Sequence, residues 1–239
     1  MELLGFGREA DVYALDSDRV LRRYRRGDDA SGEAELMEHL HGLGFPVPRV
    51  HQADGADLIL ERLDGATMTE TFRGGGIGVD EGAAILVALH QRLHALPARH
   101  GRRDGDRIQH RDLHPDNVML TSRGPVVIDW HNAAEGPPEV DVCLTAIILA
   151  QAAAAPGHPH AGAAAAVLTP FLRLSGAVPG QAGFGQAGFG DPMTGFDEAI
   201  GIRRTDPALS PAESDALAAT VTPLIRAAIS EQSGPAGGP

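Results

Sequence analysis

The sequence contains no lysine, because all twenty of its basic residues are arginine. A Walker-type phosphate-binding loop, which needs a Gly-Lys-Ser/Thr step, is therefore excluded, and so is any other chemistry that requires a lysine side chain. Aromatic residues make up only 4% of the 239 residues. A hydrophobic core must therefore be built mainly from leucine, valine, isoleucine and alanine.

Positive charge is scarce as well, and the formal net charge is −12. A protein that binds nucleic acid normally presents a basic face, so we expect no nucleic-acid partner. The single cysteine, Cys143, allows no disulfide within the chain and lies in an apolar run, where we expect a small buried side chain. No apolar run reaches the roughly 18 to 20 residues that span a bilayer, and the N-terminus has no secretory pattern. We expect a cytoplasmic protein without a membrane partner.

Short β-type runs and turns alternate over the N-terminal quarter of the chain. Residues 12–15 and 19–24 flank a polar turn and predict a hairpin, and residues 47–50 and 57–63 predict two further strands. Apolar residues at helical spacing predict one helix over residues 32–43. This order predicts a small β-rich lobe.

The rest of the chain is mainly helical in its pattern. Apolar periodicity predicts helices over residues 80–96, 140–155, 161–174 and 211–230. The chain is long enough for two small lobes.

Three segments follow from this order of elements. We predict a β-rich N-terminal lobe over residues 1–63, a mostly helical lobe over 64–230 and a disordered tail over 231–239. The pentapeptide QAGFG occurs twice in tandem over residues 181–190. Two short copies cannot build a solenoid, so we interpret the repeat as a flexible insertion in a loop.

The segment HRDLHPDNVML, residues 110–120, carries most of the candidate chemistry. Asn117 directly precedes one predicted strand, and Asp129 directly follows the next one. Paired strands lie about 5 Å apart, so the ends of this hairpin bring the two side chains together. Both offer the hard oxygen ligands that Mg²⁺ prefers. Asp112 lies nearby in the sequence, where a carboxylate can orient or deprotonate a nucleophile, and the three residues together indicate phosphoryl transfer.

A glycine-rich motif at the N-terminus points to the same chemistry. The segment GFGREADV, residues 5–12, fits the pattern G-x-G-x-x-G-x-V with Ala10 at the third glycine. It opens a strand hairpin and not a helix, so it favours a loop that covers ATP over a Rossmann fingerprint. The joint occurrence of this motif and HRDLHPDN is a stronger signal than either one alone.

These motifs resemble those of the aminoglycoside phosphotransferase family, a group of small kinase-like enzymes. The residues that carry the resemblance run from residue 5 to about residue 150: GFGREADVYAL, VLRRY, EAELMEHLHGLGFPVPRV, LILERLDG, HRDLHPDNVML, VVIDW and the aspartate of PEVDV. The C-terminal third resembles the family only loosely. The resemblance implies a protein-kinase-like two-lobed α+β fold, with a small β-rich N-lobe and a mostly helical C-lobe. It also implies ATP and Mg²⁺ as cofactors and transfer of phosphate to a hydroxyl of a small molecule.

The resemblance further implies a role for each matching residue of the C-terminal lobe. Asp112 would be the catalytic base or the residue that orients the hydroxyl, and Asn117 and Asp129 would hold Mg²⁺. His110 would brace the catalytic loop, and Asp141 would hydrogen-bond to that loop.

The same resemblance assigns the nucleotide to the N-terminal lobe. Gly5 and Gly7 would lie in the loop that covers the phosphates. The segment from Glu61 to Leu63 would be the hinge whose backbone meets adenine.

The chain departs from the family at two positions. Where the family usually has a lysine, VLRRY offers only arginine, and strand alternation favours Arg22, with Arg23 on the other face. In the family this cation anchors the phosphates of the nucleotide. Glu33 resembles the helix glutamate that orients it, and Glu35 is the alternative. The family's usual glycine in the catalytic loop is also absent, and Arg111 stands there in an H-R-D sequence.

Two other functions stay open. Arginine keeps the charge of lysine but not its geometry, so the chain could be a non-catalytic, pseudokinase-like module that only binds nucleotide. The joint presence of Asp112, Asn117 and Asp129 favours an active enzyme. A protein kinase is the second alternative, but Asp129 begins D-W-H and not D-F-G, and the segment that follows is too short for a long activation loop.

A hydrolase metal site is disfavoured. His110 and His114 would have to share one face of a helix, and Pro115 with its turn pattern opposes a helix there.

Overall fold

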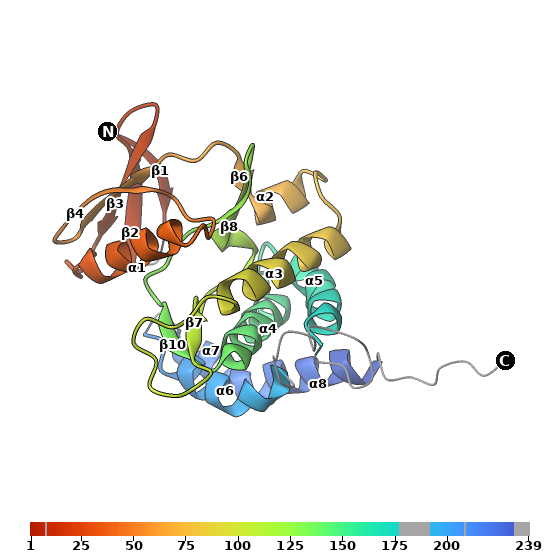
Figure 1. Cartoon of the computed structure of the whole chain (residues 1–239). Coiled ribbons are helices and arrows are strands. Elements are labelled where there is room, and N and C mark those ends of the chain that lie inside the picture. The colour runs from red at the N-terminus through yellow and green to blue at the C-terminus, as the bar shows by residue number, and fades with distance from the viewer. Residues whose placement is uncertain (8, 177–191, 208, 232–239) are drawn as a thin grey trace. The chain divides into compact units, whose positions relative to one another are not determined.

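The computed structural model describes residues 1–7, 9–176, 192–207 and 209–231 (Figure 1). The QAGFG repeat and the predicted tail beyond residue 231 lie outside these residues. The chain divides into two compact units. The first comprises Met1–Thr67 and Asn117–Ala133, and the second comprises Met68–Asp116 and Ala134–Pro239.

The first unit is built on a five-stranded antiparallel sheet of order β1-β2-β3-β5-β4. Its strands are β1 (Glu2–Phe6), β2 (Ala10–Ala14), β3 (Arg19–Tyr24), β4 (Val50–Asp54) and β5 (Asp57–Glu61). Helix α1 (Ser31–Gly42) buries Ala34, Met37 and Leu40 at helical spacing. The predicted N-terminal hairpin and the predicted first helix are confirmed.

Strand β4 lies farther along the chain than the sequence predicts. The apolar run over residues 47–50 suggested a strand there, but Pro46 and Pro48 have no N–H groups for a ladder. The N–H of Val47 instead donates to the carbonyl of Phe45 at 3.0 Å. The ladder with β5 therefore begins only at Val50, whose partner is Leu60.

A second sheet of the first unit contains the hairpin that carries two candidate site residues. Its order is β6 (Ala66–Thr67), β8 (Val118–Thr121) and β9 (Gly124–Val127). Val118 pairs with Val127, and both side chains are fully buried. The predicted hairpin is confirmed. Gly65 has a φ of +108°, and a Cβ added there would lie 2.1 Å from the carbonyl oxygen of Leu120, so only glycine fits at the entry to β6.

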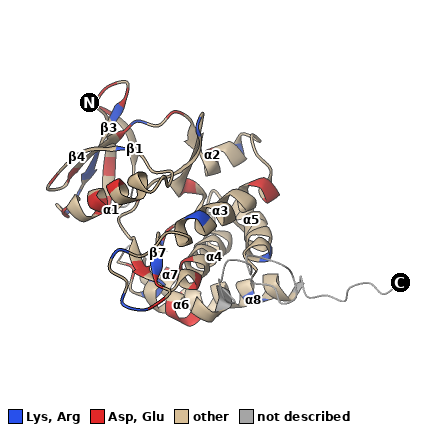
Figure 2. Ribbon diagram, viewed as in Figure 1, with Lys and Arg blue, Asp and Glu red and all other residues tan. Residues whose placement is uncertain are grey.

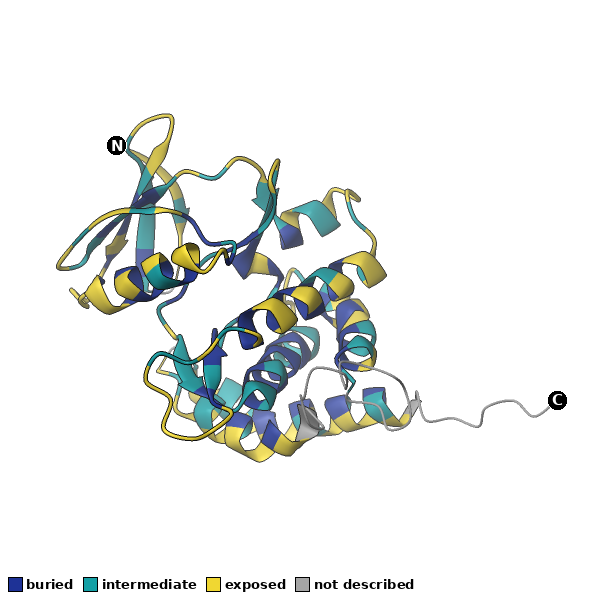
Figure 3. Ribbon diagram, viewed as in Figure 1, coloured by how far each residue is buried: buried dark blue, intermediate teal, exposed yellow. Residues whose placement is uncertain are grey.

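The second unit is mainly helical. Its helices are α2 (Met68–Arg73), α3 (Val79–His94), α4 (Pro138–Ala154), α5 (Ala161–Leu174), α6 (Phe196–Arg204), α7 (Pro211–Ala216) and α8 (Thr222–Glu231), with a two-stranded ladder of β7 (Arg107–Gln109) and β10 (Ala134–Gly136). Helix α5 packs against both α3 and α4. Helix α4 is buried over most of its length (Figure 3), as its nearly continuous apolar sequence requires.

The predicted helices of this unit are confirmed for α3, α4 and α5, and the last one is interrupted. A π-helical turn over Leu217–Val221 separates α7 from α8. Pro223 lacks the N–H that would continue the ladder, which explains the break. The predicted start is correct, because Ser210 and Glu213 form a capping box. Among the helices of the described residues, none is both long and apolar enough to cross a membrane.

Candidate functional site

A buried charged cluster in the first unit is organised by Glu33 of α1. Arg22 Nη1 of β3 lies 3.1 Å from Glu33 Oε1, and the backbone N–H of Trp130 donates to the same oxygen at 2.9 Å. The hydroxyl of Tyr24 donates to the other carboxylate oxygen. Arg22 Nη2 also donates to Asp129 Oδ1, so one guanidinium bridges two carboxylates. Figure 2 shows basic residues on β3 and acidic residues on α1.

Strand alternation on β3 separates Arg22 from Arg23, as the sequence predicts. Arg22 is 8% exposed, whereas Arg23 is exposed and pairs with Asp57. Burial alone would lower the pKa of Arg22, but the charges of Asp129 and Glu33 outweigh it and raise that pKa above its ordinary value. Arg22 therefore stays charged within the cluster.

Glu33, and not Glu35, is the helix glutamate that meets this arginine. Glu35 is exposed on the outer side of α1, whereas Glu33 is 7% exposed. Burial raises the pKa of Tyr24 well above its usual range, so the phenol stays protonated and donates to Glu33.

The two predicted metal ligands stand at the two ends of the β8–β9 hairpin. Asn117 ends the 3₁₀ turn Pro115–Asn117 and is 8% exposed, and Asp129 follows β9. The N–H of Ile128 donates to the carbonyl of Asn117 at 3.0 Å, which holds the ends together. Among the described residues, no three His, Cys, Asp or Glu side chains group around one metal position. An amide and a carboxylate supply only two ligands, so further oxygens, such as phosphate oxygens, would complete a Mg²⁺ shell.

The glycine-rich loop joins β1 to β2. The N–H of Gly7 donates to the carbonyl of Ala10 at 2.8 Å and closes the turn, while Gly5 lies within β1. Glu9 Oε2 lies 3.6 Å from His131 Nε2, a contact that the sequence analysis did not foresee. The loop is thereby linked to the segment that follows Asp129.

The predicted hinge segment lies at the end of β5. The Glu61 carboxylate accepts from the N–H of Arg49 at 3.0 Å and pairs with Arg123 at 2.8 Å. The N–H of Arg62 donates to the carbonyl of Asp18. Leu63 is half-buried, and its backbone N–H has no hydrogen-bond partner within the described part of the chain.

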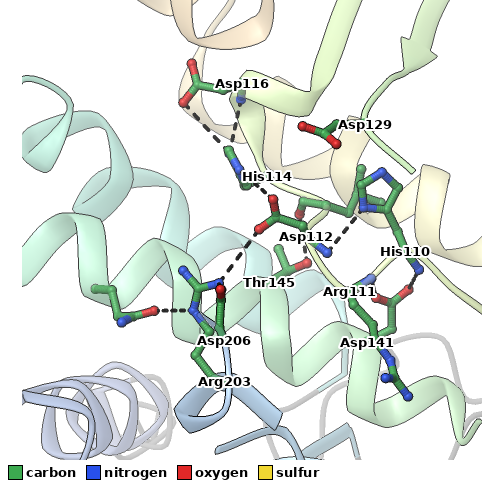
Figure 4. A network of polar contacts seen from close by, with 12 residues as sticks. His110, Arg111, Asp112, His114, Asp116, Asp129, Asp141, Thr145, Arg203 and Asp206 are labelled. Carbon is green, nitrogen blue, oxygen red and sulfur yellow. Dashed lines mark hydrogen bonds and ion pairs between the residues drawn. The ribbon is translucent and has the colours of Figure 1, made fainter. Parts of the chain in front are cut away.

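The catalytic-loop candidate of the second unit is held by Asp141 of α4. The buried Asp141 carboxylate accepts from the backbone N–H groups of His110 at 3.1 Å and Arg111 at 2.7 Å, and it lies 2.9 Å from His94 Nε2 (Figure 4 shows the loop contacts). Burial alone would raise the pKa of Asp141, but the hydrogen bond with His94 and the neighbouring histidines, His90 and His110 among them, lower it. The carboxylate that accepts the hydrogen bonds of the loop is therefore ionised.

Arg111 adopts a backbone conformation that favours glycine. Arg111 and Asp129 are the only non-glycine residues with positive φ in the described structure, each at 66°. The left-handed region is costly for a side chain, and such residues concentrate at functional sites. The Arg111 Nε donates to Gln109 Oε1 at 2.9 Å, and its N–H binds Asp141. These two contacts offset the cost that glycine would avoid.

Asp112 projects from this loop with its carboxylate among positively polarised groups. Its N–H donates to His110 Nδ1 at 3.2 Å, which places His110 behind the loop. Asp112 Oδ2 lies 3.6 Å from His114 Nε2, and its Oδ1 lies 4.0 Å from Arg203 Nη1 (Figure 4). Burial alone would raise the pKa of Asp112, but His114, His110 and Arg203 lower it below its ordinary value. An ionised carboxylate of this kind can accept the proton of a hydroxyl.

Sequence reasoning missed two buried histidines that support this loop. His90 and His94 lie on the buried side of α3, and their rings are 5.6 Å apart. His90 Nε2 lies 3.1 Å from the Thr145 hydroxyl, which donates to the carbonyl of Leu113 at 2.8 Å. Their spacing of four residues among the apolar positions of α3 was the available signal, since it places both on the inner face.

The model of the phosphotransferase enzyme family matches residues 1–107 and 79–174. No curated protein matches the sequence.

Many solved structures are similar to the chain in fold. One is a thermostable mutant of aminoglycoside phosphotransferase APH(4)-Ia with AMP-PNP and hygromycin B, with a TM-score of 0.59 and 16% identity over 98% of this chain and 94% of that one. Amicoumacin kinase hAmiN with AMP-PNP and Ca²⁺ has a TM-score of 0.52 and 15% identity over 95% and 88%. A choline/ethanolamine kinase family protein from Mesorhizobium loti has a TM-score of 0.51 and 15% identity over 96% and 90%. These likenesses confirm the predicted protein-kinase-like α+β fold.

We predict that His90 makes the second unit sensitive to mild acid. Burial lowers the pKa of His90 from 6.5 to about 4, so below about pH 6.5 the unfolded chain binds a proton that the folded chain refuses. The free energy of unfolding should therefore fall as the pH falls from about 6.5 to about 4, by roughly 3 kcal/mol in total, and stay level above that window. Urea unfolding followed by circular dichroism at several pH values measures this slope.

The variant His90→Met should flatten the slope in this window. Exposed His100 in the same unit offers the control, and His100→Gln should keep the wild-type slope. An equal slope in wild type and His90→Met would contradict the assignment.

Proposed function

Because the chain belongs to the phosphotransferase enzyme family, we propose that it transfers the γ-phosphoryl group of ATP to a hydroxyl group of a small molecule, with Mg²⁺ as the metal. The observation that carries the proposal is the cluster in which Arg22 bridges Glu33 and Asp129. It presents a fixed positive charge next to a carboxylate that can bind metal. Phosphoryl transfer depends on such positioning and electrostatic stabilisation more than on covalent chemistry by the protein.

The first unit supplies the groups that would hold the nucleotide. Arg22 would contact the α- and β-phosphates, and Asn117 and Asp129 would hold Mg²⁺, which neutralises charge on the phosphate oxygens. The backbone from Gly5 to Ala10 would cover the phosphates. The Leu63 backbone, together with Glu61 at the end of β5, would meet the adenine.

The second unit supplies the proposed base. Asp112 would accept the proton of the acceptor hydroxyl, an effect that is typically worth about 10²- to 10⁴-fold in rate. Asp141 and His110 support this role because they fix the backbone on both sides of Arg111. The lowered pKa of Asp112 keeps its carboxylate available as an acceptor at neutral pH.

The geometry of Arg22 favours an active enzyme over a non-catalytic module. Its two terminal nitrogens contact Glu33 and Asp129 separately, which uses the planar fork that distinguishes arginine from lysine. The buried Tyr24 ring lies 5.0 Å from the Arg22 guanidinium carbon and adds a further favourable contact. A site that had lost its function would not need this set of matched partners.

A small-molecule acceptor is proposed from the family and from the short segment after Asp129. The three solved structures are named for different small molecules: hygromycin B, amicoumacin, and choline or ethanolamine. A shared fold therefore does not assign the acceptor. Phosphate transfer to general protein substrates, with none to small alcohols, would instead favour a protein kinase.

We predict that ATP binding depends on Mg²⁺ and on Asp129. In isothermal titration calorimetry, wild type should bind ATP more tightly with Mg²⁺ than without it. Asp129→Asn should weaken the Mg²⁺-dependent binding by about tenfold or more, because the amide replaces a charged oxygen ligand. Asp57→Asn is the matched control, since Asp57 of β5 pairs with the exposed Arg23 of the neighbouring strand β3. Absence of ATP and GTP binding by wild type would refute the proposed function.

We predict that Arg22→Lys lowers ATP turnover by about tenfold to a hundredfold, because one ammonium group cannot reproduce the two-point fork. Steady-state ATP turnover with Mg²⁺ measures the effect. Arg23→Lys, on the opposite face of β3, should leave turnover unchanged. A large gain in turnover for Arg22→Lys would favour the non-catalytic module.

A further inference from the structure

Helix α6, which was not predicted from the sequence, places an arginine next to Asp112, the proposed base. Arg203 Nη1 lies 4.0 Å from Asp112 Oδ1, and the two side chains are 13% and 21% exposed. Arg203 lies beyond residue 174, where the match to the family model ends. The contact with Asp112 therefore comes from a part of the chain that the family model does not match.

Arg203 is fixed by two further contacts. Its Nη1 donates to Asp206 Oδ2 at 2.6 Å, and its Nε donates to Gln151 Oε1 of α4 at 2.7 Å (Figure 4 shows this network). The two contacts hold the planar guanidinium from two sides, so its position relative to Asp112 is set by α4 and by the turn after α6. The adjacent Arg204 is exposed and has no such partners within the described residues.

We propose that Arg203 is a positioning residue, which holds the carboxylate of Asp112 oriented and ionised for the acceptor hydroxyl. The proposal rests on the proposed function, in which Asp112 is the base. Among the described residues, the charged and titratable groups that face Asp112 include His110 and His114 from its own loop and Arg203 from α6, with Asp206 behind Arg203. Arg203 is the one among these three neighbours whose charge does not depend on pH in the neutral range.

The contact with Arg203 also affects the stage of the reaction at which the proton is transferred. A carboxylate that contacts a permanent cation stays deprotonated before the reaction and is a weaker base. It therefore accepts the hydroxyl proton late, as charge moves onto the transferred group. This fits a loose phosphoryl-transfer transition state, in which positioning of the hydroxyl matters more than full deprotonation.

The test compares Arg203→Met, Arg203→Lys and the matched control Arg204→Met in three measurements. Calorimetry with ATP and Mg²⁺ reports binding. Steady-state ATP hydrolysis, with water in place of the acceptor, separates kcat from KM. A ¹³C NMR titration of the aspartate carboxyls, with the Asp112 signal identified by its loss in Asp112→Asn, reports the coupling without any need for activity.

Arg203→Met should lower kcat for ATP hydrolysis by about tenfold to a hundredfold, with ATP affinity and KM unchanged. The pKa of Asp112 should rise, because a charge about 4 Å away has been removed. Arg203→Lys keeps the charge but not the contact with Gln151, so it should restore the titration and only part of the rate. Arg204→Met should match wild type in all three measurements.

An unchanged Asp112 titration together with an unchanged kcat in Arg203→Met would overturn the proposal. If that variant does not fold, Asp206→Asn replaces it, because it loosens Arg203 without altering Asp112. A smaller change in the same direction is then expected, and wild-type behaviour would overturn the proposal. Failure of wild type to bind ATP would refute the proposed function instead, while the titration would still decide whether Arg203 acts on Asp112.

Discussion

A buried carboxylate must have its oxygens satisfied by donors, and this requirement organises both units of the chain. In the first unit, the Glu33 carboxylate accepts hydrogen bonds from Arg22, Tyr24 and the backbone of Trp130. These bonds fix α1, β3 and the segment after the β8–β9 hairpin to one another. In the second unit, Asp141 gathers two backbone N–H groups and a histidine. Each carboxylate fixes one half of the proposed chemistry: the phosphate-binding cation in the first unit and the base-bearing loop in the second.

Local spacing was enough to predict the residues that strands and turns place. Alternation along β3 predicted that Arg22 faces inward and Arg23 outward. The hairpin after Asn117 predicted that this residue and Asp129 lie at neighbouring strand ends. In all these cases the contact follows from a short segment whose periodicity is known.

The contacts that sequence reasoning missed join residues far apart in the chain. His94 of α3 contacts Asp141 of α4, 47 positions farther along the chain. Arg203 of α6 contacts Asp112, which lies in the loop before β8. No local pattern encodes such packing. The shift of β4 shows a further limit, because an apolar run predicted a strand where prolines remove the ladder donors. The left-handed backbone of Arg111, with φ of 66°, was also not predicted from the sequence, although the glycine that the resemblance led us to expect there was a signal of it.

In the proposed reaction, Asp112 receives the hydroxyl proton during transfer of phosphate from ATP to a small molecule. Incubation with [γ-³²P]ATP, Mg²⁺ and a panel of sugars, alcohols and amino alcohols tests it directly, with wild type, Asp112→Asn and Asp116→Asn compared. Asp116 is an exposed acidic residue of the same loop, so its variant controls for loss of charge. We expect ³²P label in at least one small molecule with wild type and with Asp116→Asn. With Asp112→Asn, the rate of labelling should fall by about a hundredfold or more. Equal labelling by wild type and Asp112→Asn, or label in protein substrates alone, would contradict it.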